Sequence, residues 1–226
     1  MISIRHHLSN SFYDPDTVLN EKAQAVWRYL NKENVVGAGA VRGKSITKRA
    51  QEFLTIVESH EHACHYSRPA ARRHSALLKA LLNDGTLEKL ITSGPRELDA
   101  LADTLSPILA NADFEKCGTH AAFSELLQNK VFNYKAYRDS DFCSSLYIEL
   151  KFTTVTCPYC NEYPVKVILR SKGKDKKPIL HFDLDHFYPK NKYPFLALSF
   201  YNHIPSCKYC NSLHKQDRPF TRSEER

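Results

Sequence analysis

The chain has 226 residues, 42% of them hydrophobic and 25% charged, and its formal net charge is +7. That length allows a sizeable core in one domain or two, and no run reaches the ~18 to 20 apolar residues that a membrane-spanning helix needs. The N-terminus contains His6 and His7 where a secretory signal would have an apolar core, so we expect a cytoplasmic protein that does not bind membranes.

Apolar residues recur at three- and four-residue spacing through much of the first 150 residues, which predicts a mainly helical region. The expected helices cover residues 21–31, 47–61, 72–82, 95–110 and 120–129. In the first of them, Ala23, Val26 and Leu30 form one apolar stripe. Gly85 marks the end of the third helix, and Pro107 is expected to kink or end the fourth. These patterns assign no specific role to the region.

One group of metal-ligating side chains lies within the helical region, at His60, His62, Cys64 and His65. Such a group allows a second metal site. However, these positions do not share one helix face, and no distant partner pair accompanies them. A solvated or partner-facing helix end is therefore the favoured interpretation.

The residue pattern changes after Val131, and aromatic and β-branched residues replace the helical stripes through residues 147–155. We therefore expect a domain boundary at about residue 150. Residues 1–150 hold 18 Lys and Arg against 18 Asp and Glu, whereas residues 151–226 hold 14 against 7. The net positive charge thus lies in the last third of the chain, which favours nucleic-acid phosphates as partners, although a solvated lysine-rich face also explains such a distribution.

The last third is predicted to contain two strands and a helix. Residues 163–170 and 178–185 read as antiparallel strands, joined by a turn at 171–175. After a loop, a helix is expected to begin at Asn211 and to end before Pro219. The predicted fold class is α+β, with a mainly helical region over residues 1–150 and a strand–strand–helix module over residues 151–226.

Four of the seven cysteines form two C-x-x-C pairs, Cys157 with Cys160 and Cys207 with Cys210, and 46 residues separate the pairs. In a reducing cytoplasm, cysteines at this spacing are metal ligands more often than disulfides. Two such pairs complete a tetrahedral thiolate site, so we expect a structural zinc ion. Two independent redox pairs would need a thioredoxin-like context, which the sequence lacks.

A second pattern interlocks with the cysteine pairs. Asp185 and His186 end the second predicted strand, Asn202 follows after fifteen residues in the loop, and Asn211 follows after eight more, directly behind Cys210. The motifs are Leu184-Asp185-His186-Phe187, Asn202-His203-Ile204-Pro205 and Cys207-Lys208-Tyr209-Cys210-Asn211. In order and spacing they resemble the signature of HNH endonucleases. The resemblance covers about 60 of the 226 residues and implies a zinc-stapled ββα-metal nuclease module.

The chemistry of phosphodiester hydrolysis suggests a role for each residue. A neutral histidine suits the activation of water near pH 7, which makes His186 the candidate general base. Mg²⁺ or Mn²⁺ takes oxygen ligands, and Asp185 and Asn211 offer a carboxylate and an amide oxygen. Asparagine stands where many family members have the third histidine. By resemblance, Asn202 fixes the loop that orients the base.

Further residues near this series are candidates for binding roles. His214 would share a helix face with Asn211, and it either ligates the metal, contacts a phosphate or is simply exposed. His181 and His203 are expected to be surface or packing residues. Four lysines are candidate nucleic-acid contacts: Lys190, Lys192, Lys208 and Lys215.

The motifs are most similar to those of the HNH subunits of bacterial anti-phage systems of the Septu type, some of them associated with retrons. The resemblance implies a nuclease that cuts DNA or RNA together with an ATPase subunit, on which the helical region would dock. Two alternatives remain. One is a non-catalytic zinc-dependent nucleic-acid-binding module, and the other is a partner-interaction protein in which the zinc module only supports folding.

Overall fold

The structure, a computed structural model, describes residues 4–9, 11–32, 44–153, 155–172 and 175–215. It divides into two compact units, which we name the β unit and the helical unit. The β unit comprises Met1–Lys22, Tyr134–Pro189 and Asn202–Arg226, and the helical unit comprises Ala23–Asn133 and Lys190–Tyr201. Within the described ranges, every helix is too short or too polar to cross a membrane. The α+β class expected from the sequence is confirmed.

The units follow a different division from the single boundary expected at about residue 150. Helices α9 (Tyr134–Arg138) and α10 (Asp141–Glu149) belong to the β unit, because α10 packs on its strands β3 and β4. Conversely, Lys190–Tyr201 belongs to the helical unit, although it connects two strands of the β unit. The chain therefore leaves the β unit after Pro189 and returns to it at Asn202.

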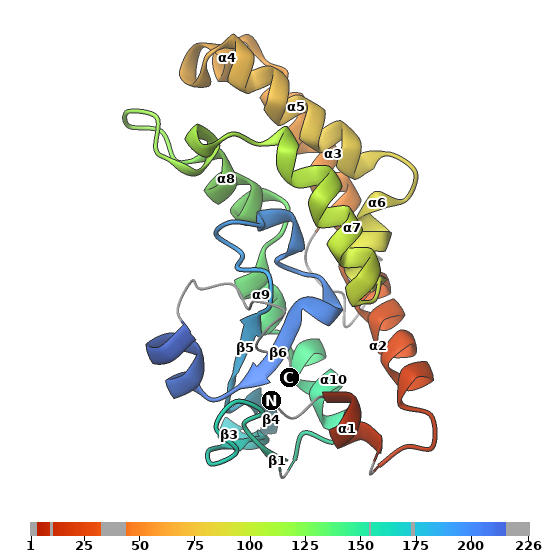
Figure 1. Cartoon of the computed structure of the whole chain (residues 1–226). Coiled ribbons are helices and arrows are strands. Elements are labelled where there is room, and N and C mark those ends of the chain that lie inside the picture. The colour runs from red at the N-terminus through yellow and green to blue at the C-terminus, as the bar shows by residue number, and fades with distance from the viewer. Residues whose placement is uncertain (1–3, 10, 33–43, 154, 173–174, 216–226) are drawn as a thin grey trace. The chain divides into compact units, whose positions relative to one another are not determined.

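The described part of the helical unit consists mainly of helices. They are α2 (Pro15–Leu30, which begins in the β unit), α3 (Ile46–Val57), α4 (His60–Tyr66), α5 (Arg68–Leu82), α6 (Thr86–Thr92), α7 (Pro95–Leu105) and α8 (Phe123–Lys130), with the 3-10 helices η1 (Ser106–Ile108), η2 (Asn111–Phe114) and η3 (Pro194–Leu196). Figure 1 shows α3 and α5 side by side. Between them and α8, Phe53 stacks on Phe123 with ring centroids 5.8 Å apart.

Local capping explains where two predicted helices differ from the structure. The helix expected over residues 47–61 is divided into α3 and α4, because the hydroxyl of Ser59 accepts a hydrogen bond from the N–H of His62 and starts a new helix. The helix expected over residues 95–110 ends at Leu105. Pro107 lies in the 3-10 helix that follows, since proline lacks the N–H that a continuing α-helix needs.

The described residues of the β unit form three separate two-stranded antiparallel sheets. They pair β1 (Val155–Thr156) with β2 (Pro164–Val165), β3 (Val167–Lys172) with β4 (Asp175–Leu180), and β5 (Asp183–His186) with β6 (His203–Ser206). The unit also contains α1 (Ile4–Ser9), α9, α10 and the π-helix η5 (Tyr209–Lys215). The 3-10 helix η4 (Phe200–Asn202) begins in the helical unit and ends in the β unit at Asn202.

Two strand predictions are corrected by this arrangement. The returning strand expected over residues 178–185 is interrupted by a bend at His181 and Phe182, so that its two parts become β4 and β5 with different partners. The residues after Asn202, expected in a loop, form β6. The hairpin that carries Asp185 and His186 is therefore β5–β6, and η5 follows it directly (Figure 1).

Candidate metal centre and adjoining polar site

The two cysteine pairs converge on one point. The ligand atoms of Cys157, Cys160, Cys207 and Cys210 all lie within 4.8 Å of one another, and the Sγ atoms of Cys160 and Cys207 are 4.0 Å apart. Tetrahedral zinc with Zn–S bonds of roughly 2.3 Å requires sulfur–sulfur distances of about 3.8 Å. The four thiols can therefore hold a metal ion, and the donor set is compatible with structural zinc.

Each cysteine pair lies on a tight turn that backbone N–H groups stabilise by hydrogen bonds. In the first turn, the N–H of Cys157 donates to the carbonyl of Tyr163 at 2.8 Å, and Asn161 has the left-handed φ of 52° that asparagine tolerates. In the second turn, the N–H of Cys207 donates to Cys157 Sγ at 3.3 Å, and that of Cys210 donates to Cys207 Sγ at 3.4 Å. Such N–H donors stabilise the thiolates that bind a metal.

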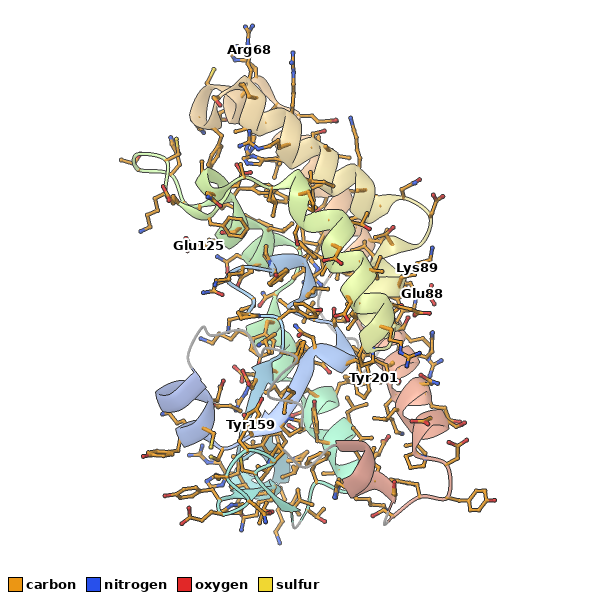
Figure 2. The ribbon with its side chains drawn as sticks, viewed as in Figure 1. Arg68, Glu88, Lys89, Glu125, Tyr159 and Tyr201 are labelled. Carbon is orange, nitrogen blue, oxygen red and sulfur yellow. The ribbon has the colours of Figure 1, made fainter. Side chains whose placement is uncertain are left out.

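Asp185, at the end of β5, is buried with 4% of its surface exposed. The hydroxyl of Tyr159, from the first cysteine turn, donates to Asp185 Oδ2 at 2.6 Å. Burial and the neighbouring carboxylate raise the pKa of Tyr159, so its hydroxyl stays protonated as a donor. Tyr159, labelled in Figure 2, thereby links the metal centre to the hairpin.

His186 is also buried, with 6% of its surface exposed. It pairs with His203 across the β5–β6 ladder, and the two ring centroids are 5.1 Å apart. The ring of Tyr134 lies 4.6 Å from that of His186, and its hydroxyl donates to the carbonyl of Leu184 at 3.0 Å. The rings of Tyr134 and His203 therefore pack against His186. His203 is a buried packing residue, whereas His181 is exposed.

Asn202 holds the backbone that follows His186. Its Oδ1 accepts from the N–H of Tyr188 at 2.7 Å, and its Nδ2 donates to the carbonyl of Tyr188 at 3.2 Å. The backbone carbonyl of Asn202 also accepts from the N–H of Phe187 at 3.0 Å. With 1% of its surface exposed, Asn202 fixes the end of β5 from two sides.

Asn211 contacts a residue that the sequence analysis did not single out. Its Nδ2 donates to Asp183 Oδ2 at 3.1 Å, and Arg138 Nη2 lies 3.9 Å from Asp183 Oδ1. Side chains alternate along a strand, so Asp183 and Asp185 point to the same face of β5. This two-residue alternation is the signal that could have identified Asp183 from the sequence.

Of the predicted basic contacts, Lys190, Lys192 and Lys208 are exposed. Lys190 and Lys192 lie in the helical unit, and Lys208 lies between the last two cysteines. The side chains of His214 and Lys215 lie outside the described part of the structure.

The histidine group of the helical unit requires a correction. His62, expected at a solvated or partner-facing helix end, is buried, and its Nε2 lies 2.9 Å from Nδ1 of the buried His74. His74 Nε2 lies 3.0 Å from Asp113 Oδ1, and the guanidinium of Arg73 donates to both oxygens of Asp113. Among the described residues, the only cluster of metal-ligating groups is that of the four cysteines. His62, His74 and Asp113 thus form a buried hydrogen-bonded chain, whereas His60 and Cys64 are exposed.

This chain predicts that the protein is less stable in mild acid. Burial lowers the pKa of His62 to about 4 and also lowers that of His74, so the unfolded chain binds more protons below pH ~6.5. The contribution of these neutral histidines to the free energy of unfolding is therefore present at pH 7 and is lost as the pH falls toward 4. Between pH 7 and pH 5, protonation of His62 in the unfolded chain alone is expected to lower the free energy of unfolding by about 2 kcal/mol.

Chemical denaturation at a series of pH values measures this slope. His62→Gln is expected to flatten it, whereas the exposed control His60→Gln is expected to retain it. An unchanged slope in His62→Gln would assign the acid sensitivity to other groups.

No protein-family model, curated protein or solved structure matches the chain.

Proposed function

We propose that the chain is a metal-dependent endonuclease of the HNH type, which hydrolyses phosphodiester bonds in nucleic acid. The observation that supports this proposal is the β5–β6 hairpin. Asp185 and His186 lie in β5, Asn202 directly precedes β6, and Asp185 accepts a hydrogen bond from Tyr159 of the first cysteine turn. The order of two antiparallel strands and a helix in β5, β6 and η5 agrees with that of a ββα-metal module.

In the proposed mechanism, the imidazole of His186 takes the proton of the attacking water. Asn202 orients His186 by fixing the backbone of Phe187 and Tyr188. Asp185 and Asn211 would hold Mg²⁺ or Mn²⁺, which stabilises negative charge on the phosphoryl and departing oxygens. Tyr159 orients the carboxylate of Asp185, and Asp183 orients the amide of Asn211.

The burial of His186 suggests that the proposed nuclease needs a partner subunit. Because the side chain is buried against Tyr134, a phosphate reaches it only after this packing opens. An ATPase partner subunit of the kind found with Septu-type nucleases, in some cases within a retron complex, would supply that opening. The cellular role we propose is therefore the nuclease effector of an anti-phage system.

A cleavage assay tests the function. We expect the purified chain, together with any ATPase encoded beside it, to cut plasmid DNA or total tRNA when Mg²⁺ or Mn²⁺ is present and to stop when the metal is chelated. The substrate that is cut then decides between DNA and RNA. Absence of cutting from both substrates under all metal and partner conditions would exclude the nuclease.

One observation favours a second candidate function. The burial of His186 and the hydrogen bond from Tyr159 to Asp185 also suit a purely structural role for these residues. The chain would then be a non-catalytic zinc-dependent nucleic-acid-binding module. That function predicts binding without cleavage, and binding that survives the replacement of His186.

A further inference from the structure

A pocket of about 450 Å³ lies within the β unit, beside the cysteine centre. Its lining includes two tyrosines, Tyr163 and Tyr209, with exposed fractions of 46% and 49%. Their ring centroids are 6.1 Å apart and their planes are inclined by 35°. Large aromatic rings that remain this exposed are available to stack on a ligand.

The metal centre fixes the positions of both tyrosines. Tyr163 accepts the N–H of Cys157 through its backbone carbonyl, and Tyr209 lies between Cys207 and Cys210. The two rings therefore come from two chain segments, each anchored by a cysteine pair. Anchoring of these turns limits how far the backbones of the two tyrosines can move before a ligand binds.

Cationic groups line the same pocket. The exposed Lys208 and the side chain of Arg138 are both in its wall, and Arg138 is held by a hydrogen bond from Nη2 to the carbonyl of Phe182 at 2.8 Å. Asp183 is the one carboxylate of the lining, and it accepts from Asn211. Aromatic faces next to Lys and Arg are the combination that binds single-stranded nucleic acid through its bases and phosphates.

The pocket also adjoins the proposed reaction site. Asp183 lies in its wall, and Asp185 lies two residues further along the same face of β5. A nucleotide in the pocket would thus belong to the strand whose phosphate is being cut.

We propose that this pocket binds an unpaired nucleotide, with its base stacked on Tyr163 or Tyr209 and its phosphate beside Lys208 and Arg138. In a regular duplex the faces of the bases are covered by their neighbours, so stacking requires a base that is out of the helix. The substrate class that follows is single-stranded nucleic acid, or a duplex with an unpaired segment near the cut. This inference rests on the proposed nuclease function.

Binding measurements without Mg²⁺ or Mn²⁺ test the inference separately from cutting. The probes are a short labelled oligothymidylate, the same strand with abasic positions, and a duplex of equal length. We expect the oligothymidylate to bind best. Tyr163→Leu and Tyr209→Leu should each weaken its binding roughly tenfold, while binding of the abasic strand stays unchanged.

Matched variants separate stacking from other effects. Tyr209→Phe keeps the ring and should bind within about twofold of wild type, and Tyr13→Leu removes an exposed tyrosine outside the pocket and should have no effect. Zinc content and the melting temperature show whether each variant is folded. Equal affinity of the leucine variants and wild type for oligothymidylate, or an equal loss for the abasic strand, would overturn the pocket assignment.

The outcomes also distinguish this inference from the proposed function. Cutting of nucleic acid by wild type together with unchanged binding in the leucine variants refutes the pocket and leaves the nuclease. Tyrosine-dependent binding without any cutting refutes the nuclease and leaves a binding site for single strands.

Discussion

Replacing His186 with alanine is expected to lower the cleavage rate by about 10²- to 10⁴-fold, the usual contribution of a general base. Its position supports a large effect, since Asn202 and the β5–β6 ladder hold the backbone on either side of the imidazole. The measurement is the initial rate of strand cutting in saturating Mg²⁺ or Mn²⁺, with the substrate identified in the first assay.

Because His186 is buried, the alanine variant also leaves a cavity, and two controls separate catalysis from folding. His186→Gln fills most of the space without the base, and should be as inactive as His186→Ala with a melting temperature closer to wild type. His60→Ala removes an exposed histidine of the helical unit and should cut at the wild-type rate. If folded, zinc-loaded His186→Ala cuts as fast as wild type, the imidazole is not the base.

Replacing Cys207 with serine is expected to release the metal ion and to unfold the β unit. Zinc bound by four thiolates contributes apparent free energies of ~10–16 kcal/mol in small zinc-dependent folds, and loss of one ligand removes most of that contribution. In this chain the effect should be large, since Cys207 Sγ accepts the N–H of Cys210, the N–H of Cys207 donates to Cys157 Sγ, and Cys207 lies between β6 and η5. The zinc content should fall from one ion per chain to none, and the melting temperature should fall well below that of wild type.

Cys64→Ser provides the matched control, because Cys64 is exposed and belongs to the helical unit. It should retain both zinc and the wild-type melting curve. A Cys207→Ser variant that lacks zinc but melts like wild type would show that the metal does not support the fold.

Local sequence signals predicted part of this structure well. The helical pattern of the first 150 residues depends on side-chain periodicity, and the described residues there are mainly helical. The antiparallel pairing of β3 with β4 is present as well, while the centre of the turn expected at 171–175 lies outside the described residues. The cysteine spacing also predicted which four thiols lie together. A tetrahedral zinc ion needs four ligands, and two C-x-x-C pairs supply four thiols.

Features that depend on contacts between distant residues could not be predicted from local sequence patterns. Strand β6 is only four residues long and contains Pro205, so its pairing with β5 is set by the tertiary structure. The burial of His62 depends on His74 and Asp113, which lie 12 and 51 positions further along the chain. Histidine spacing alone does not reveal such a partner.

The segment Lys190–Tyr201 has a consequence for how the molecule is assembled. Phe195, Leu196 and Leu198 in this segment are completely buried, and η3 packs on α6 and α8 of the helical unit. Asp185 in β5 and Asn202 directly before β6 thus lie at the two ends of a connection whose middle belongs to the helical unit. The segment is also synthesised long after the helices that receive it. A nascent chain therefore completes its candidate reaction centre last, and truncation at residue 150 would remove part of the helical core as well as the β unit.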